Sequence, residues 1–292
     1  MKSDFMKRTL VTIIGIPLIL ITICIPFGKN LLFALIVSLI VFFSSQEYQA
    51  IIRHKWIVEY KNFFPFLCTG LSILAWLEGF SSFPFHISGL LISILTFFIF
   101  QFTKTNFFDS ISIISTYSLG IFLTGWCLPH LISILQQKEG LYLISIFFFS
   151  VWLGDIFAYI SGIIIFGDKR HKIPWKVSPA KSYEGYIGQL IGNIAGVFIA
   201  QLIFIKKLNL SFACFVLSSD GFTFPWWAVP FVGIFIGIFS AAGDLSESIL
   251  KRSVNIKDSG SVLTGHGGFL DRFDSFLFSA PAFYYLCRLL VK

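Results

Sequence analysis

The amino-acid sequence predicts an all-α integral membrane protein, a polytopic bundle of about nine transmembrane helices. Of its 292 residues, 56% are hydrophobic, only 13% are charged and 37 are phenylalanine. A spanning helix needs roughly 20 consecutive apolar residues, and the chain offers many such windows. A soluble core of this size would not need apolar residues over nearly the whole chain, so the composition argues against a soluble domain.

The expected spans follow the apolar runs of the chain. They lie at about 9–26, 31–46, 64–82, 86–103, 108–126, 141–166, 186–205, 225–243 and 272–290. The first run follows a basic head, as a signal peptide does, but no convincing small-residue cleavage site comes after it, so we expect a retained span. The fifth run can extend through Pro129, and the sixth is long enough to tilt or break near Gly154.

The distribution of Lys and Arg predicts the orientation. With the N-terminus inside, 16 of the 22 basic residues fall on the cytoplasmic side and 6 on the outside, as the positive-inside rule expects. The net charge of +7 is then explained by anionic headgroups rather than by nucleic acid. We therefore expect a multi-pass protein of the cell inner (cytoplasmic) membrane. We divide it into N-terminal helices, 1–140, with about five spans and a C-terminal region, 141–292, with about four.

The C-terminal region carries two polar loops, 167–185 and 244–271, which this orientation places in the cytoplasm. The stretch 244–275 concentrates five acids and four bases in a chain with few charges. Carboxylates bind hard divalent cations, Lys and Arg bind phosphate, and glycines let backbone N–H groups approach it. These residue types indicate a nucleotide polyphosphate held with its metal, and the alternative is a solvated loop.

Spacing supports the functional interpretation of this stretch. If the preceding helix continues, Asp244, Ser248 and Lys251 lie on one face at i, i+4 and i+7. Asp271 and Asp274 share a face at i and i+3. We expect an active site at the cytoplasmic face.

The other loop adds a second group of polar residues. Asp155 lies inside an apolar run, where an acid costs about 2.5–3.5 kcal/mol on insertion scales and usually faces a bundle interior or a wet cavity; a hydrogen-bonded packing role is the alternative. Ser178, Lys181 and Ser182 offer a cation and two hydroxyls just before a helix start, which suits an anionic substrate. The basic run 169–172 can instead simply hold lipid headgroups.

The remaining spans are expected to serve packing. Small residues recur every four positions in the seventh span (Gly188, Gly192, Gly196) and in the eighth (Gly233, Gly237, Ala241). This spacing lets membrane helices approach closely, so we expect these two stripes to meet and to fix the start of the charged helix. The first five spans carry little chemistry. We expect Glu47 and Glu78 to be interfacial, and His86 and His130 to be interfacial or hydrogen-bonded structural residues.

The run from residue 248 to 274 reads Ser-x-Leu-Lys-Arg-x4-Lys-Asp-x-Gly-x2-Leu-x2-His-Gly-Gly-Phe-x-Asp-Arg-Phe-Asp. It closely resembles the signature of phosphatidate cytidylyltransferases, or CDP-diacylglycerol synthases, except that Thr264 stands where the family usually has Pro or Gly. The segment 178–185 is similar to the family's Ser-Pro-Lys-Lys-Thr-x-Glu-Gly element, with Ala180 and Ser182 replacing Lys and Thr. The likeness is strongest from Gly154 onward.

The resemblance implies synthesis of CDP-diacylglycerol and pyrophosphate from CTP and phosphatidate, for phospholipid biosynthesis. It implies Mg²⁺ as the divalent cation, K⁺ as a second ion, membrane lipids and a second copy of the chain as partners, and no nucleic acid. The residues assigned to catalysis are Asp244, Lys251, Lys257, Asp258, His266, Asp271, Arg272 and Asp274. Those assigned to substrate binding are Asp155, Ser178, Lys181, Ser182, Ser248, Arg252, Gly267 and Gly268.

Asp244 and Asp271 are the expected metal ligands. Both sit where an apolar span meets the cytoplasmic layer, and the 26 residues between them are enough for the chain to fold back. Two converging carboxylates repel each other, and a divalent ion removes that conflict. The alternative is that each acid pairs with a nearby base, for example Asp271 with Lys257.

Two other functions compete. A CDP-alcohol phosphatidyltransferase would carry the run Asp-Gly-x2-Ala-Arg-x8-Gly-x3-Asp-x3-Asp, which the sequence lacks. A transporter or channel would place charges near the middle of the membrane on discontinuous helices. Asp155 alone fits that pattern.

Overall fold

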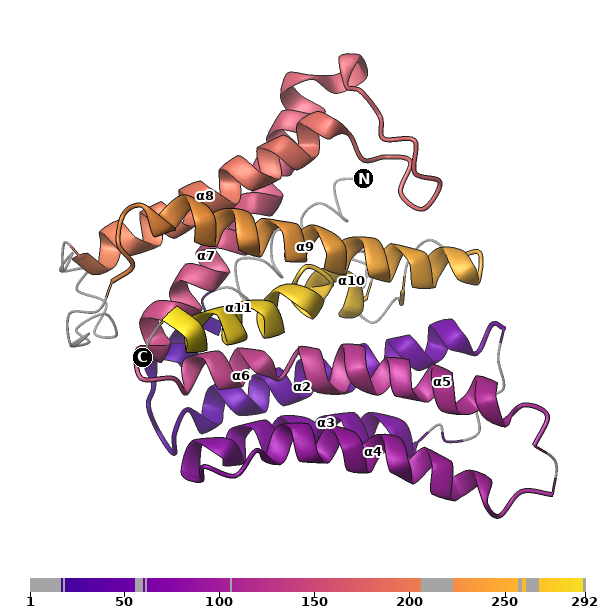
Figure 1. The fold of residues 1–292 in the computed structure, drawn as a ribbon. Helices are drawn as coiled ribbons and strands as arrows, with labels where there is room; N and C mark the ends of the chain where they lie inside the picture. Colours follow the sequence, from indigo (N-terminus) through magenta and orange to yellow (C-terminus); the bar gives the residue numbers. More distant parts are fainter. Residues whose placement is uncertain are drawn as a thin grey trace. The chain divides into compact units, whose positions relative to one another are not determined.

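The regular secondary structure in the described part of the chain is helical (Figure 1). The computed structural model describes residues 17, 19–55, 60, 62–105, 107–205, 223–256, 259–260 and 268–290. Within these residues there is no strand, and one isolated bridge joins Lys172 to Ser182. The predicted all-α class is therefore confirmed.

The chain forms two compact units. The first comprises Met1–Gln136 and Leu250–Phe273, and the second Gln137–Ile249 and Asp274–Lys292. Helix α9 (Ala228–Ser253) runs from the second unit into the first. The division of the chain into 1–140 and 141–292, with the chemistry assigned to the second part, stays a prediction.

The first unit is built from antiparallel helices with an aromatic interior. Its elements are α2 (Leu31–Ile52), α3 (Phe63–Leu77), η1 (Glu78–Phe80), α4 (Phe85–Gln101), α5 (Ser110–Gly120), η2 (Ile121–Cys127), α6 (His130–Leu135) and α10 (Leu270–Phe273). Phe97 and Tyr117 stack with ring centroids 4.5 Å apart, and the hydroxyl of Tyr48 donates to the Thr116 carbonyl at 2.7 Å. These large rings are buried, so aromatic packing holds α2, α4 and α5 together.

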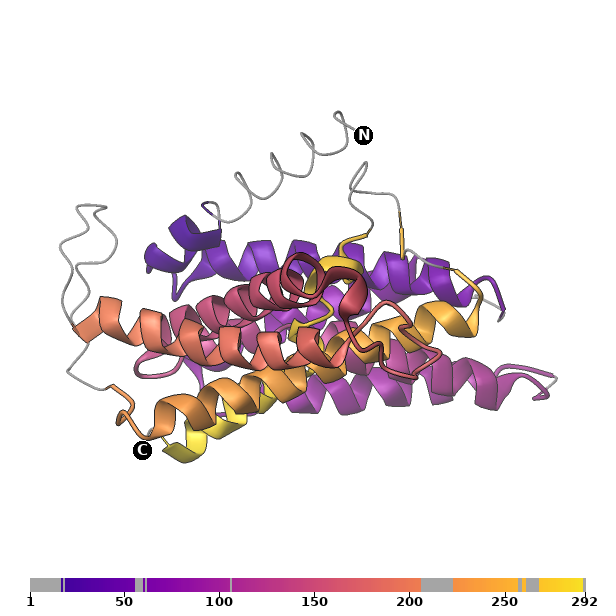
Figure 2. The same cartoon turned by 90° about the horizontal axis from the view of Figure 1, so that it is seen from above.

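The second unit is built around α7 (Gly140–Tyr159) and α8 (Tyr183–Ile205), which pack along their length (Figure 1 and Figure 2). The wide turns of η3 (Ile160–Ile165) and the short η4 (Gly167–Lys169) follow α7. Helix α9, up to Ile249, lies along α8, and α11 (Phe276–Leu290) packs on α7 through the stacked rings of Phe147 and Phe283.

Six helical segments are long and apolar enough to cross a membrane, judged by length and composition. They are Leu31–Ile52, Phe63–Phe80, Ser110–Leu135, Gly140–Ile165, Tyr183–Phe204 and Ala228–Ser253. The apolar helix Phe85–Gln101 is one residue short of 18, α11 has 15 residues, and most of the expected span 9–26 lies outside the described residues. The protein is thus a multi-pass membrane protein, and the count of nine is not confirmed.

Two details of the expected spans are now decided. The fifth does extend through Pro129, because its apolar helical segment ends at Leu135. Of the two expectations for the sixth span, the break near Gly154 is wrong, since α7 continues to Tyr159 and widens only in η3, while the tilt stays a prediction. Gly154 lies against the side chain of Asn193 on α8, so its lack of a Cβ serves helix packing rather than a bend.

The two glycine stripes do not meet each other, which corrects the prediction. A Cβ on Gly192 would overlap the Leu153 carbonyl and lie 2.7 Å from Cβ of Phe157, so the α8 stripe faces α7. A Cβ on Gly233 would lie 2.6 Å from Cα of Ile194, so the α9 stripe faces a different side of α8. The expected close approach of helices at these glycines is confirmed, but the α8 stripe packs against α7 and the α9 stripe packs against α8.

We predict that Gly192→Leu lowers the free energy of unfolding by about 1–3 kcal/mol, because the new side chain has no space against the α7 backbone. Ile191→Leu is the matched control, since Ile191 is 53% exposed and the change conserves volume. Thermal unfolding of both variants in detergent measures the difference. Equal Tm values would contradict the α7–α8 packing.

Candidate functional site

Helix α9 continues past its apolar part to Ser253, as the spacing predicted. Asp244, Ser248 and Lys251 therefore lie on one helix with the expected i, i+4 and i+7 relation. Lys251 and Arg252 fall in its last turn, where cations interact favourably with the helix dipole. Because the unit boundary follows Ile249, the polar residues form two groups, one in each unit.

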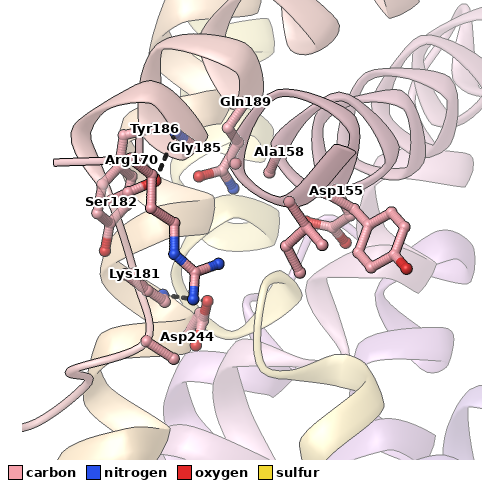
Figure 3. A pocket seen from close by; sticks show the side chains of 13 residues that line it. Asp155, Ala158, Arg170, Lys181, Ser182, Gly185, Tyr186, Gln189 and Asp244 are labelled. Carbon is pink, nitrogen blue, oxygen red and sulfur yellow. Dashed lines mark hydrogen bonds and ion pairs between the residues drawn. The ribbon is translucent and has the colours of Figure 1, made fainter. Parts of the chain in front are cut away.

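The group in the second unit surrounds a cavity of about 210 Å³ (Figure 3). Three residues assigned from the sequence to binding, Asp155, Lys181 and Ser182, line it together with Asp244. Helix α7 supplies Asp155, the loop before α8 supplies Lys181, and α9 supplies Asp244. The sequence thus identified four residues of one cavity from segments about ninety positions apart.

Lys181 and Asp244 form an ion pair in the wall of this cavity. The ammonium group of Lys181 also lies 5.3 Å from the centre of the Tyr186 ring, within reach of a cation–π interaction. Burial acts to lower the pKa of Lys181, but the Asp244 carboxylate beside it more than compensates, so the pKa is raised above its ordinary value. Lys181 is therefore a cation held at the cavity.

Local hydrogen bonds fix the loop that carries Lys181. Ser182 is the N-cap of α8, since its hydroxyl accepts the N–H of Gly185 at 3.1 Å. The carboxylate of Glu184 accepts the backbone N–H of His171 at 3.0 Å and contacts its Nδ1 at 2.6 Å. The N–H of Ile173 donates to the Lys181 carbonyl at 3.1 Å. The loop is thereby attached to the first turn of α8 at both of its ends.

Two further residues of the cavity were not assigned from the sequence. Arg170 lines it, and Figure 3 shows its guanidinium directed toward Lys181 and Asp244. Gln189 lines it from the second turn of α8. Arg170 belongs to the basic run whose simplest interpretation was lipid headgroup binding, so residue type did offer a signal. Gln189 had none, because it is one of three amides in the apolar helix α8, with Asn193 and Gln201, and nothing in the sequence distinguishes it from a packing residue.

The group in the first unit is centred on Asp271 in α10. Its Oδ1 accepts from the ammonium of Lys251 at 2.7 Å. Its Oδ2 accepts the backbone N–H groups of Ser259 at 3.1 Å and Gly268 at 2.9 Å. The sequence-derived alternative, pairing of an acid with a nearby base, thus describes Asp271 with Lys251, while Lys257 lies outside the described residues.

Glu47 is the residue that sequence reasoning misjudged. It was expected to be interfacial, yet it is 3% exposed and its carboxylate accepts the N–H groups of Phe269 and Leu270 at 2.9 and 2.8 Å. His86 and His130 are buried too, and Nδ1 of His130 lies 2.8 Å from the Trp126 carbonyl, which fits the structural role. The signal for Glu47 was the same as for Asp155: an acid at an apolar run.

The other assigned residues are placed individually. Ser178 lies in the turn before Lys181, whose N–H donates to the Ser178 carbonyl at 3.1 Å, and Ser248 is half-buried on α9. Arg252 donates to the Ile256 carbonyl at 3.3 Å, and Arg272 is exposed. The residues Lys257, Asp258, His266 and Gly267 lie outside the described part.

Asp274 does not share a helix with Asp271, contrary to the expected i, i+3 relation. Helix α10 ends at Phe273 and α11 begins at Phe276, with a turn between them. Oδ1 of Asp274 accepts the N–H of Ser275 at 2.6 Å, and its carbonyl accepts the N–H of Leu277 at 3.1 Å. Asp274 thus shapes the entry into α11.

The described side chains include no group of three or more His, Cys, Asp or Glu that could hold a metal ion. Two carboxylates, Asp155 and Asp244, nevertheless line the cavity of the second unit, and carboxylate oxygens are the donors that hard cations take. The donor chemistry of these two carboxylates therefore fits a divalent ion. A site shared by Asp244 and Asp271 stays a prediction, because these residues belong to different units.

We predict that Asp244→Asn makes Lys181 reactive at lower pH. Without the carboxylate, only Tyr186 still opposes the effect of burial on the amine, so the pKa of Lys181 falls and the neutral, nucleophilic form appears earlier as pH rises. The measurement is the pH dependence of Lys181 acetylation by mass spectrometry. Lys172, exposed in the same loop, is the internal control, and an unchanged Lys181 profile would contradict the ion pair.

Comparison with known proteins agrees with the resemblance found in the motifs. Proteins called phosphatidate cytidylyltransferase are similar to this chain: that of Staphylococcus saprophyticus is 38% identical over 145 residues, and that of Staphylococcus haemolyticus 40% over 146. The protein of that name from Staphylococcus aureus is 38% identical over 145 residues. Each match covers 50% of this chain and 48% of the relative, so the chain spans about half the length of the curated relatives it matches.

A family model covers far more of the sequence. The model of the cytidylyltransferase family matches residues 6–290, which includes the cavity of the second unit and the Asp271 group of the first. A transporter or channel is not favoured by this match. The chain belongs to the cytidylyltransferase family.

Proposed function

We propose that the protein is a nucleotidyltransferase that joins CTP and phosphatidate to give CDP-diacylglycerol and pyrophosphate. The observation that carries the proposal is the cavity in which Lys181 and Arg170 face Asp244, within a chain that matches the cytidylyltransferase family over residues 6–290. The names of the staphylococcal relatives supply the substrate class. A multi-pass membrane protein is also a suitable place for a lipid substrate.

The chemistry requires little proton transfer. A phosphate oxygen of phosphatidate forms a bond to the α-phosphorus of CTP, and the bond from that phosphorus to the bridging β-phosphate oxygen breaks, releasing pyrophosphate. Phosphomonoesters have a second pKa of about 6, so the attacking group is already largely ionised at pH 7. Catalysis is therefore mainly positioning and neutralisation of phosphate charge.

The cations of the cavity are suited to that task. Lys181 is kept protonated beside Asp244, and the fork of Arg170 opens onto the same space. In the proposed complex these two groups bind phosphate oxygens, Arg as a bidentate donor and Lys as a point charge. Ser182 is committed to capping α8, so its contribution is to hold Lys181 in place and to offer its remaining hydroxyl hydrogen.

The group around Asp271 also contains a lysine paired with an aspartate. Lys251 is paired with Asp271. Arg252 follows Lys251 in the sequence, Arg272 follows Asp271, and both arginines are exposed. We propose that Lys251, Arg252 and Arg272 neutralise the rest of the triphosphate. The segment with Lys257, Asp258, His266 and Gly267 is assigned to the same task on the motif alone. The exact roles of Ser178 and Ser248 rest on the resemblance.

A divalent cation is part of the proposal. Asp244 and Asp271 are the proposed ligands of Mg²⁺, with Asp155 as a neighbouring carboxylate on the cavity side and K⁺ as a second ion. When bound, Mg²⁺ supplies positive charge that offsets the charge on the transferred phosphoryl group. Each of the two proposed metal-binding aspartates, Asp244 and Asp271, is paired with a lysine. When the aspartate binds the metal ion, a phosphate of the substrate becomes the new partner of that lysine.

The proposed location is the cytoplasmic side of the inner membrane. The excess of Lys and Arg on one side supports it. So does the contact of Glu47 with Phe269 and Leu270, because it places the end of α2, next to the basic residues Arg53 and Lys55, beside the motif. A homodimer is proposed from the family resemblance.

The purified protein in detergent is predicted to release pyrophosphate from CTP when phosphatidate is present, and to do so only with a divalent cation. Product formation is followed by pyrophosphate detection and by chromatography of the lipid. Omission of phosphatidate is the control for simple CTP hydrolysis. Full turnover in excess chelator would reject the metal, and no turnover in any lipid mixture would count against the proposed reaction.

Asp244→Asn and Asp271→Asn are each predicted to nearly abolish turnover and to raise the Mg²⁺ concentration needed for half-maximal rate. If both hold one ion, the double variant loses little more than either single variant, because residues acting as a unit are not additive. A Mg²⁺ titration of all three variants measures this. Additive losses with unchanged Mg²⁺ dependence would show that each acid serves only its own lysine.

A further inference from the structure

We propose that Glu47 is a positioning residue: it holds the described residues of one motif segment, 259–260 and 268–270, in the conformation that presents Asp271 to its ligand. The functional consequence rests on the proposed cytidylyltransferase activity, while the structural part stands on the contacts. Glu47 is 212 residues away from Ser259 in the sequence, and it lies outside the family motif from Ser248 to Asp274. It belongs to the N-terminal helices, to which the sequence assigned little chemistry.

The carboxylate of Glu47 uses both oxygens on this segment. Oε1 accepts the N–H of Phe269 at 2.9 Å, and Oε2 accepts the N–H of Leu270 at 2.8 Å and the hydroxyl of Ser259 at 3.3 Å. An ionised carboxylate is the side chain that can accept on both oxygens without offering a donor. The match between acceptor and donors explains why an acid stands at a buried position.

Glu47 and Asp271 accept the three successive N–H groups of residues 268–270. The N–H of Gly268 goes to Asp271, and those of the next two residues go to Glu47. The residue that follows these two anchored positions is Asp271 itself. Glu47 therefore fixes the backbone that orients the Asp271 carboxylate. The ion pair of this carboxylate with Lys251, at 2.7 Å, depends on that orientation.

Close packing around Glu47 supports a fitted arrangement. A Cβ on Gly268 would overlap the Glu47 carboxylate and the Ser259 hydroxyl, and a Cβ on Gly260 would lie 2.9 Å from Oε1 of Glu47. The ring of Phe269 stacks on Phe43, one turn earlier on α2, with centroids 4.9 Å apart. The small residues of the motif thus make room for Glu47, and α2 contacts the segment through both an acid and an aromatic ring.

The decisive variant is Glu47→Gln, which keeps the size of the side chain but replaces one acceptor oxygen with an NH₂ group. One of the two backbone N–H groups then loses its partner. Hydrogen exchange measured by mass spectrometry on the intact protein in detergent reports this directly. Because a hydrogen bond to a charged group is lost, we expect exchange in peptides covering 268–271 to become about tenfold faster.

The Mg²⁺ dependence of turnover supplies the functional measurement. Residues that orient a metal ligand typically change metal affinity by about tenfold or more when altered, so we expect a corresponding rise in the Mg²⁺ concentration for half-maximal rate. Glu78→Gln is the matched control. Glu78 also accepts a backbone N–H, that of His86 at 2.6 Å, but at the start of α4, so neither readout for 268–271 should change.

Each outcome decides a part of the proposal. Unchanged exchange at 268–271 in Glu47→Gln would overturn the anchoring role. Faster exchange with unchanged Mg²⁺ dependence would leave an anchor and overturn its action through Asp271. If the unaltered protein has no cytidylyltransferase activity, the proposed function fails, whereas the exchange result still decides whether Glu47 holds the segment.

Discussion

Partners for three acids, Asp244, Asp271 and Glu47, hold together much of this apolar chain. An isolated carboxylate away from water is costly, and the cost is avoided when an ammonium group or several N–H donors face it. Asp244 faces Lys181, Asp271 faces Lys251 and two N–H groups, and Glu47 faces two N–H groups and a hydroxyl. These pairings determine which loops are held at which helices.

The same pairings prepare the site for anions. A lysine held by a carboxylate is a charged group that has already lost much of its freedom, so binding a phosphate orders it less. The cavity of the second unit contains such a lysine beside Arg170. In the first unit the equivalent lysine is Lys251, at the end of α9, where the helix dipole also favours its charge. Each unit thus brings its own preorganised cation.

Local patterns predicted what local physics controls. The continuation of α9 through Lys251 follows from apolar periodicity and the i, i+4 spacing of polar residues, and the helix start after Lys181 follows from the hydroxyl of Ser182 as a cap. The long-range partners were beyond reach. A four-residue glycine spacing identifies a close face on α8 but not that its neighbour is α7. Likewise, no residue near Glu47 in the sequence indicates that its carboxylate binds Phe269, 222 positions away.

The wide turns of η3 determine which sequence changes this segment tolerates. In a π-helix one extra residue is accommodated in the turn, and each residue of an α-helix rotates the chain by about 100°. Deleting a single residue just before Ser161 would therefore turn its hydroxyl away from the Glu184 carbonyl, which it reaches at 3.0 Å. Gly162 would leave Gly185 as well. In this segment the exposed positions Ile160 and Ile163–Ile165 can accept apolar substitutions. A deletion of one residue, in contrast, would detach the Lys181 loop from the end of α7.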